Sequence, residues 1–139
     1  MVDITKEFVT PEIALKLKEL GFNEPCLGIY DTDFKLYTDS KSEHFESQEK
    51  VQYIFGNIKY KIILAPLWQQ VFDWFFDKHG IIISFQYNIT YDNTIIKINN
   101  IKTMEIYSIS EMYDGYDFPK LRNIGIFKAI DILNGVKFR

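Results

Sequence analysis

Residues 66–91 read PLWQQVFDWFFDKHGIIISFQYNITY, and their hydrophobic spacing changes at Gly80. Pro66 suits the first turn of a helix and Gly80 suits its end. Between them, apolar residues including Trp74 cover about half of a helical circumference, which predicts a deeply packed helix over 66–79. From 81 to 91, apolar and polar residues alternate, and this period of two predicts a β-strand.

The residues that follow predict further antiparallel strands. Asp92 and Asn93 form a turn that leads to a strand over 95–98. Asn99 and Asn100 then make either a bulge or another turn before a strand over 104–109.

The C-terminal part predicts a loop and a helix. Residues 110–117, SEMYDGYD, are expected to form the loop, and Asp117 can cap a helix over 118–134. Gly125 lies in the middle of the inward face, where it would allow close approach of another element. The residues expected to face inward are Leu121, Ile124, Gly125, Ala129, Ile132 and Leu133.

Upstream, local signals predict a helix and a hairpin. Thr10, as N-cap before Pro11, begins a helix over 11–20 that Gly21 ends. The segments 27–30 and 34–37 flank Asp31-Thr32-Asp33, which predicts two strands joined by a polar turn.

Residues 38–64 are less regular. The stretch 38–50, TDSKSEHFESQEK, holds one strong hydrophobe and is expected to be a mobile loop. Residues 51–64 are apolar around Gly56-Asn57, which predicts strand, turn and strand, or one continuous bulged strand.

Together these elements predict a single α+β domain over 1–139. Its expected architecture is an antiparallel sheet of about four to six strands packed against about three helices, in the order α-ββ-β-α-βββ-α. The length of 139 residues and the apolar fraction of 47% allow a core of useful size.

Charge and cysteine content exclude several classes of protein. A net charge of -3 disfavours nonspecific binding to nucleic acid. No uncharged stretch approaches the roughly 18 residues of a membrane span, and the acidic N-terminus does not resemble a signal peptide. The lone Cys26 fits a reducing compartment. A soluble cytoplasmic protein is therefore expected.

Three segments carry a resemblance to a known family: TPEIALKLKELGFNEPC (10–26), LAPLWQQVFDWFFDKHGIIISF (64–85) and FPKLRNIGIFKAIDIL (118–133). The pattern resembles small proteins of Bacteroides-type gut bacteria, their prophages and their phages, including crAss-like phages. The resemblance rests on Cys26 after a Gly-Phe helix end, on Trp74 after an Ala-Pro helix entry, and on Gly125. It implies a phage or mobile-element product in a bacterial cytoplasm, and it carries over no catalytic or binding residue.

The common catalytic and phosphate-binding motifs are absent, and no metal or cofactor is expected. His44 lies in the predicted loop, and His79 is expected to stabilise a helix end as an imidazolium. Cys26 is expected to be a packing thiol. Asp31 and Asp33 are expected to serve the turn rather than a cation.

The best candidate for binding is the loop at 111–117, which places two tyrosines beside a helix N-terminus. Its proposed binding residues are Tyr113, Asp114, Tyr116 and Asp117. The alternative is that both tyrosines fold onto the sheet edge and close the core. Trp68 and Phe72 are expected in the core rather than in an exposed patch.

Two classes of function remain open. The favoured one is a noncatalytic binding module that engages a host protein or sequesters a small ligand. The alternatives are a small hydrolase acting on a nucleotide or other phosphate ester, and a minor virion or assembly component. The sequence indicates no oligomeric state.

Overall fold

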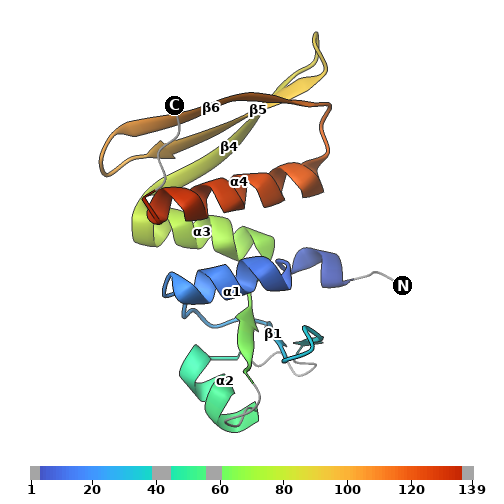
Figure 1. The fold of residues 1–139 in the computed structure, drawn as a ribbon, viewed down its shortest axis with the longest axis vertical. Coiled ribbons are helices and arrows are strands. Elements are labelled where there is room, and N and C mark those ends of the chain that lie inside the picture. The colour runs from blue at the N-terminus through green and yellow to red at the C-terminus, as the bar shows by residue number, and fades with distance from the viewer. Residues whose placement is uncertain (1–3, 39–44, 56–60, 136–139) are drawn as a thin grey trace. The chain divides into compact units, whose positions relative to one another are not determined.

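The computed structural model describes residues 4–38, 45–55 and 61–135. The chain divides into two compact units, residues 1–71 and 72–139. Each unit holds helices and one three-stranded antiparallel sheet (Figure 1). The predicted α+β class and antiparallel pairing are confirmed, and the strands of the described residues are divided between two sheets rather than joined in one.

The first unit contains a short sheet with the strand order β2-β1-β3. Its elements are η1 (Ile4–Glu7), α1 (Pro11–Glu19), β1 (Gly28–Tyr30), β2 (Leu36–Thr38), α2 (Gln48–Phe55) and β3 (Ile63–Ala65). The central strand β1 is buried along its whole length. Ile13 and Leu17 of α1 are also buried, as their spacing predicts.

Local hydrogen bonds set the ends of α1 and the β1–β2 turn, as predicted. The Thr10 side chain accepts a hydrogen bond from the Ile13 amide at 3.4 Å, and Gly21 takes a φ of +92° after the helix. In the turn, Asp31 Oδ1 accepts hydrogen bonds from the amides of Asp33 and Lys35 at 2.9 Å each. Such side-chain to backbone bonds are the reason Asp is favoured in turns.

The prediction for the segment around α2 is wrong from Phe45 onward. Phe45 pairs with Cys26 through two backbone hydrogen bonds, and Gln48–Phe55 is a helix rather than loop followed by strand. Residues 39–44 and the predicted Gly56-Asn57 turn lie outside the described residues.

Hydrogen bonds to residues distant in the sequence explain why Gln48–Phe55 forms helix α2. Asn23 Oδ1 accepts from the Gln48 amide at 2.6 Å. The Gln48 side chain donates to the Ile62 carbonyl and accepts from the Leu64 amide at 3.2 Å. Because these bonds tie α2 to β3, a polar segment with few hydrophobes is ordered by tertiary contacts that sequence periodicity does not contain.

The second unit contains the longer sheet, with the strand order β4-β5-β6. Helix α3 begins in the first unit and continues into the second. The elements are α3 (Trp68–His79), β4 (Ile81–Asn88), β5 (Asn93–Asn100), β6 (Glu105–Asp114) and α4 (Phe118–Leu133). Figure 1 shows α4 lying along this sheet.

Helix α3 follows the sequence prediction closely, whereas strand β4 is three residues shorter than predicted and the turn lies at 89–92 rather than at 92–93. Gly80 separates them with a φ of +67°, and its amide donates to the Phe76 carbonyl at 2.9 Å. Trp74 and Phe75 are buried, as expected of the apolar face of the helix. Strand β4 ends at Asn88, whose side chain accepts a hydrogen bond from the Thr90 amide and so begins the turn.

The remaining strands differ from the prediction in two places. Asn100 begins a turn by accepting hydrogen bonds from the amides of Lys102 and Thr103, so the turn alternative is confirmed over the bulge there. The register of β5 against β6 instead shifts between Ile95 and Lys97. Strand β6 continues to Asp114, so the predicted loop at 110–117 is wrong for residues 110–114, of which 112–114 pair with β5.

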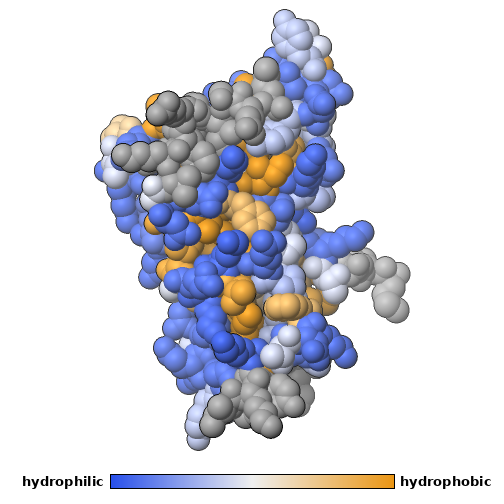
Figure 2. Space-filling model, viewed as in Figure 1, coloured by the Kyte–Doolittle hydropathy of each residue, from blue (hydrophilic) through white to orange (hydrophobic). Residues whose placement is uncertain are grey.

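Helix α4 begins where it is predicted to begin, but the face that it buries differs from the predicted one. The Asp117 side chain accepts a hydrogen bond from the Lys120 amide at 3.3 Å, which confirms the N-cap. The buried residues are Leu121, Gly125, Ile126, Ala129 and Ile130, whereas the predicted Ile124, Ile132 and Leu133 are only half-buried. Apolar residues occur all around this helix, so periodicity did not determine its orientation. Figure 2 shows hydrophobic residues at the surface in the region of α4.

Candidate functional site

The connection between β6 and α4 is held against the β4–β5 turn. The Gly115 amide donates to the Asp92 carbonyl at 2.7 Å, and Thr94 Oγ1 donates to the Gly115 carbonyl at 2.6 Å. Thr94 is fully buried, and Gly115 takes a φ of +69° that favours glycine. The connection is therefore held at its centre by two hydrogen bonds, one of them from the buried Thr94.

This arrangement brings together three aromatic rings that we call the aromatic surface: Tyr87, Tyr116 and Phe118. The Tyr116 ring lies 6.1 Å from the Phe118 ring at an interplanar angle of 19°, and 5.5 Å from the Tyr87 ring at 58°. The three residues are 40%, 52% and 38% exposed, respectively. The Tyr116 ring thus contacts both of the others, while each ring keeps a large part of its area in water.

Two further aromatic residues, Phe85 and Phe72, extend the ring contacts of this surface toward α3. Phe85 meets the Phe118 ring edge to face at 5.6 Å, and Phe72 of α3 meets Phe85 in the same way at 6.3 Å. Edge-to-face pairs of this kind favour a defined ring orientation. The exposed rings therefore continue a partly buried row of aromatic side chains.

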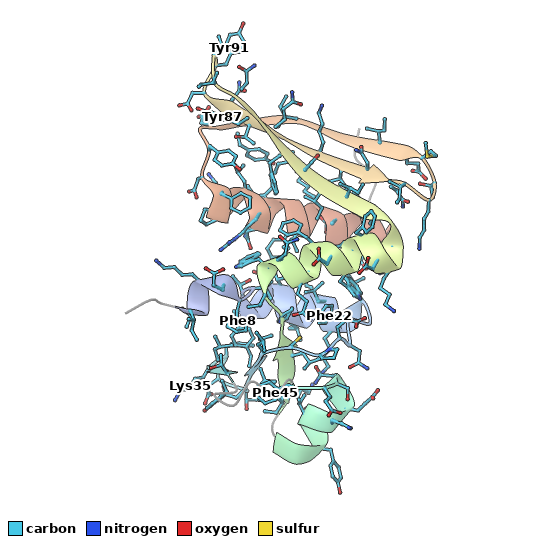
Figure 3. The ribbon with its side chains drawn as sticks, turned by 180° about the vertical axis from the view of Figure 1, so that it is seen from behind. Phe8, Phe22, Lys35, Phe45, Tyr87 and Tyr91 are labelled. Atoms are coloured by element: carbon cyan, nitrogen blue, oxygen red, sulfur yellow. The ribbon has the colours of Figure 1, made fainter. Side chains whose placement is uncertain are left out.

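Polar groups border the aromatic surface. The Tyr87 hydroxyl donates to Asp92 Oδ1 at 2.5 Å, and this hydrogen bond raises the pKa of Tyr87. The Arg122 guanidinium lies 5.7 Å from the centre of the Phe118 ring, within the range of a cation–π contact. Figure 3 shows Tyr87 on β4 and Tyr91 at the tip of the following turn.

The structure separates the four residues predicted to bind. Tyr116 belongs to the aromatic surface, and Asp117 caps α4. Tyr113 lies within β6 opposite Thr94 and is half-buried, whereas Asp114 lies opposite Asn93 and is exposed. Whether any of them binds a partner stays a prediction.

Sequence reasoning did not include Tyr87 and Phe118 in this site. The sequence pattern places Tyr87 in the alternating strand and Phe118 at the first position of the last helix. The available signal was a turn after the alternating strand, which the structure places at 89–92, because a hairpin that reverses there brings Tyr87 close to the strand leading into residues 115–118. Which strand pairs with which is a tertiary property that the signal does not supply.

His79 lies at the end of α3 as predicted, but its surroundings do not favour the charged ring expected there. Burial, and then the charge of Lys102, lower the pKa of His79, so the neutral ring is favoured. The ring packs against Trp74 at a centroid distance of 4.9 Å. At this helix end a cation is supplied by Lys102, whose Nζ donates to the Lys78 carbonyl at 3.1 Å. His44 lies outside the described residues.

Other candidates from the sequence have structural roles. Trp68 is buried and its Nε1 donates to the Lys6 carbonyl at 2.9 Å, in agreement with the core prediction. Asp31 serves its turn, whose backbone hydrogen bonds lower the pKa of its carboxyl. Within residues 4–38, 45–55 and 61–135, no three His, Cys, Asp or Glu residues are grouped to hold a metal ion. Every helix in those ranges is too short or too polar to span a bilayer.

Cys26 is a buried thiol whose Sγ donates to the Glu24 carbonyl at 3.3 Å. Burial raises the pKa of Cys26 to about 12. Because the thiolate is the reactive form, the native protein is expected to react with a thiol-specific disulfide reagent at pH 8 at least tenfold more slowly than the denatured protein, a margin of about one pKa unit. Release of the chromophore measures both rates. Equal rates in the two states would contradict the burial of Sγ.

No protein-family model, curated protein or solved structure matches this chain.

Proposed function

We propose that this protein is a noncatalytic binding module whose aromatic surface engages a protein partner. The observation that carries the proposal is that Tyr87 of β4 lies against Tyr116, which stacks on Phe118 at the start of α4, while the three residues stay 38% to 52% exposed. Exposed aromatic side chains on a rigid base are typical of the centres of protein interfaces. The resemblance to proteins of gut bacteria and their phages supports a bacterial host protein as the partner.

The physical basis is the low entropic cost of using these side chains. A tyrosine ring offers a large contact area with few rotatable bonds, and its hydroxyl can form hydrogen bonds at the rim of an interface. Here ring contacts and the Tyr87–Asp92 hydrogen bond already restrict the side chains. Binding would therefore cost less ordering than on a surface of long flexible side chains.

The proposal assigns no chemical step to Cys26 or His79. Burial shifts the pKa of each side chain in the direction that favours its neutral form. Both groups pack in the structure, Cys26 as a buried thiol and His79 against Trp74. Cys26 at neutral pH is therefore a poor nucleophile, and His79 is a weaker base than an ordinary histidine.

A double variant tests the aromatic surface directly. Tagged protein is used to isolate partners from lysate of a gut Bacteroides strain, and the affinity of each captured partner is then measured with purified components. Tyr87→Ala with Tyr116→Ala should weaken binding at least tenfold, which corresponds to about 1.4 kcal/mol. The loss is expected because these two rings provide most of the exposed aromatic area of the site.

The matched control is Tyr53→Ala with Tyr91→Ala, since these tyrosines are 89% and 74% exposed and lie outside the aromatic surface. The control should bind like the parent protein, and thermal unfolding should show that both double variants are folded. If the folded Tyr87 and Tyr116 variant binds every partner with unchanged affinity, the aromatic surface is not the binding site and the proposal fails.

A further inference from the structure

Asp92 holds a carboxylate beside the Tyr87 ring in a restricted position. Its Oδ1 accepts a hydrogen bond from the Tyr87 hydroxyl at 2.5 Å, and its backbone carbonyl accepts one from the Gly115 amide at 2.7 Å. Asp92 takes a φ of +47°, a conformation that aspartate tolerates in turns better than most residues. The side chain and the backbone of Asp92 are therefore both held in place before a partner binds.

The second carboxylate oxygen of Asp92 is open to a partner. Asp92 is exposed, and within the described part of the chain its Oδ2 has no hydrogen bond or ion pair. An ionised carboxylate that accepts one hydrogen bond keeps its negative charge and can accept more at its other oxygen. The turn thus presents a negatively charged acceptor at the edge of the Tyr87 ring.

The exposed rings add a second attraction for a cation. The face of an aromatic ring has a negative electrostatic potential, so a cation placed over it is attracted. The protein already contains one such contact, between the Arg122 guanidinium and the Phe118 ring at 5.7 Å. Tyr87 and Tyr116 remain 40% and 52% exposed. A cation at these two tyrosines would meet aromatic rings and a carboxylate at once.

Charge differs between the two ends of the aromatic surface. The segments 86–95 and 112–119 carry its rings, and their charged residues are all acidic: Asp92, Asp114 and Asp117. Basic residues follow on α4, where the Arg122 guanidinium lies over Phe118. A further cation is therefore attracted to the Tyr87 end of the surface and repelled from the Phe118 end.

Resting on the binding function proposed above, we propose that the protein partner presents an arginine whose guanidinium lies against Tyr87 and Tyr116 and donates to Asp92 Oδ2. Arginine fits this place better than lysine, because a planar guanidinium stacks on a ring while its N–H groups donate to a carboxylate. The complementary charges of the two groups would also set the orientation of the partner on the aromatic surface.

Three peptides test this proposal before any partner is identified. They are acetyl-Gly-Gly-Arg-Gly-Gly-amide and the same peptide with lysine or glutamine at its centre. In a titration followed by NMR, the arginine peptide should shift the ring signals of Tyr87 and Tyr116 with a dissociation constant of about 10 mM. The lysine peptide should bind more weakly than the arginine peptide, and the glutamine peptide at least fivefold more weakly.

Asp92→Asn isolates the role of the charge, since the asparagine Oδ1 can still accept the Tyr87 hydroxyl. This variant should raise the dissociation constant of the arginine peptide at least threefold and leave that of the glutamine peptide unchanged. The matched control is Asp77→Asn, which removes the same charge from an exposed position on α3 and should bind like the parent. Thermal unfolding should show that both variants are folded.

The outcomes distinguish this proposal from the binding function on which it rests. Ring signals that do not respond to the arginine peptide, equal affinity for the arginine peptide and either other peptide, or unchanged affinity in Asp92→Asn would each overturn the arginine contact. The binding function is measured separately, with captured partners and the Tyr87→Ala with Tyr116→Ala variant. If that variant loses a partner that Asp92→Asn binds with unchanged affinity, the aromatic surface remains a binding site and the arginine contact is wrong.

Discussion

Replacing Trp74 with Ala is expected to lower the free energy of unfolding by about 3 to 5 kcal/mol. Trp74 is buried in α3, with its ring 5.3 Å from Phe75 and 4.9 Å from His79. Truncation to alanine removes the transfer free energy of the indole and leaves a cavity that its neighbours fill only in part. The effect is large compared with the 5 to 15 kcal/mol that typically stabilises a whole domain.

Urea denaturation followed by far-ultraviolet circular dichroism measures this loss, since the variant lacks one of the two tryptophans that fluorescence would report. Phe76→Ala is the matched control, because Phe76 belongs to the same helix and is 46% exposed. The control should lose less than half as much stability as Trp74→Ala. A loss below about 1 kcal/mol for Trp74→Ala would show that the indole is not part of a packed core.

Replacing Gly125 with Leu is expected to destabilise the protein by about 3 kcal/mol. A Cβ atom at Gly125 would lie 2.9 Å from Ile83 Cγ2 and 3.2 Å from the Phe85 ring, closer than ordinary van der Waals contact. Ile83 is β-branched and stiff, so it cannot yield by a simple rotation. A leucine side chain must therefore push α4 away from β4, which costs packing energy along the contact.

The choice of leucine isolates the steric effect, since leucine favours helices by nearly 1 kcal/mol over glycine and this gain opposes the expected loss. Lys120→Leu serves as the control because Lys120 is an exposed position on the same helix. Thermal and urea unfolding should place the control within about 0.5 kcal/mol of the parent. Equal stability of Gly125→Leu and the parent would mean that α4 does not approach β4 as closely as the structure has it.

Elements with strong local signals agree with the sequence predictions. Helix α1 begins after Thr10, helix α4 begins after Asp117, and Gly80 ends α3 before β4. Caps, turn hydrogen bonds and hydrophobic periods act within a few residues, so they operate in the same way wherever the segment lies. The close approach expected at Gly125 is also confirmed, by the Ile83 and Phe85 side chains.

Predictions failed where the stabilising partner is distant in the sequence. Helix α2 depends on hydrogen bonds from Asn23 and to residues 62–64, none of which is a neighbour in the chain. Strand β6 extends to Asp114 because β5 pairs with it over that length. In α4 the buried face follows from what packs on it, since apolar residues occur on every side.

In the candidate site, too, some features follow from the local sequence and others from tertiary pairing. Tyr116 and Asp117 could be selected because two tyrosines, a glycine and a capping residue stand together beside a helix start. The contacts of Tyr116 with Tyr87 and Phe118 depend on the pairing of β4, β5 and β6, since that pairing brings the β4–β5 turn to the start of α4. Caps and turns depend on interactions between residues close in the chain, so the sequence predicts them. Which side chains lie next to Tyr116 depends instead on how distant strands pair, and that is decided by the free energy of the whole packed sheet.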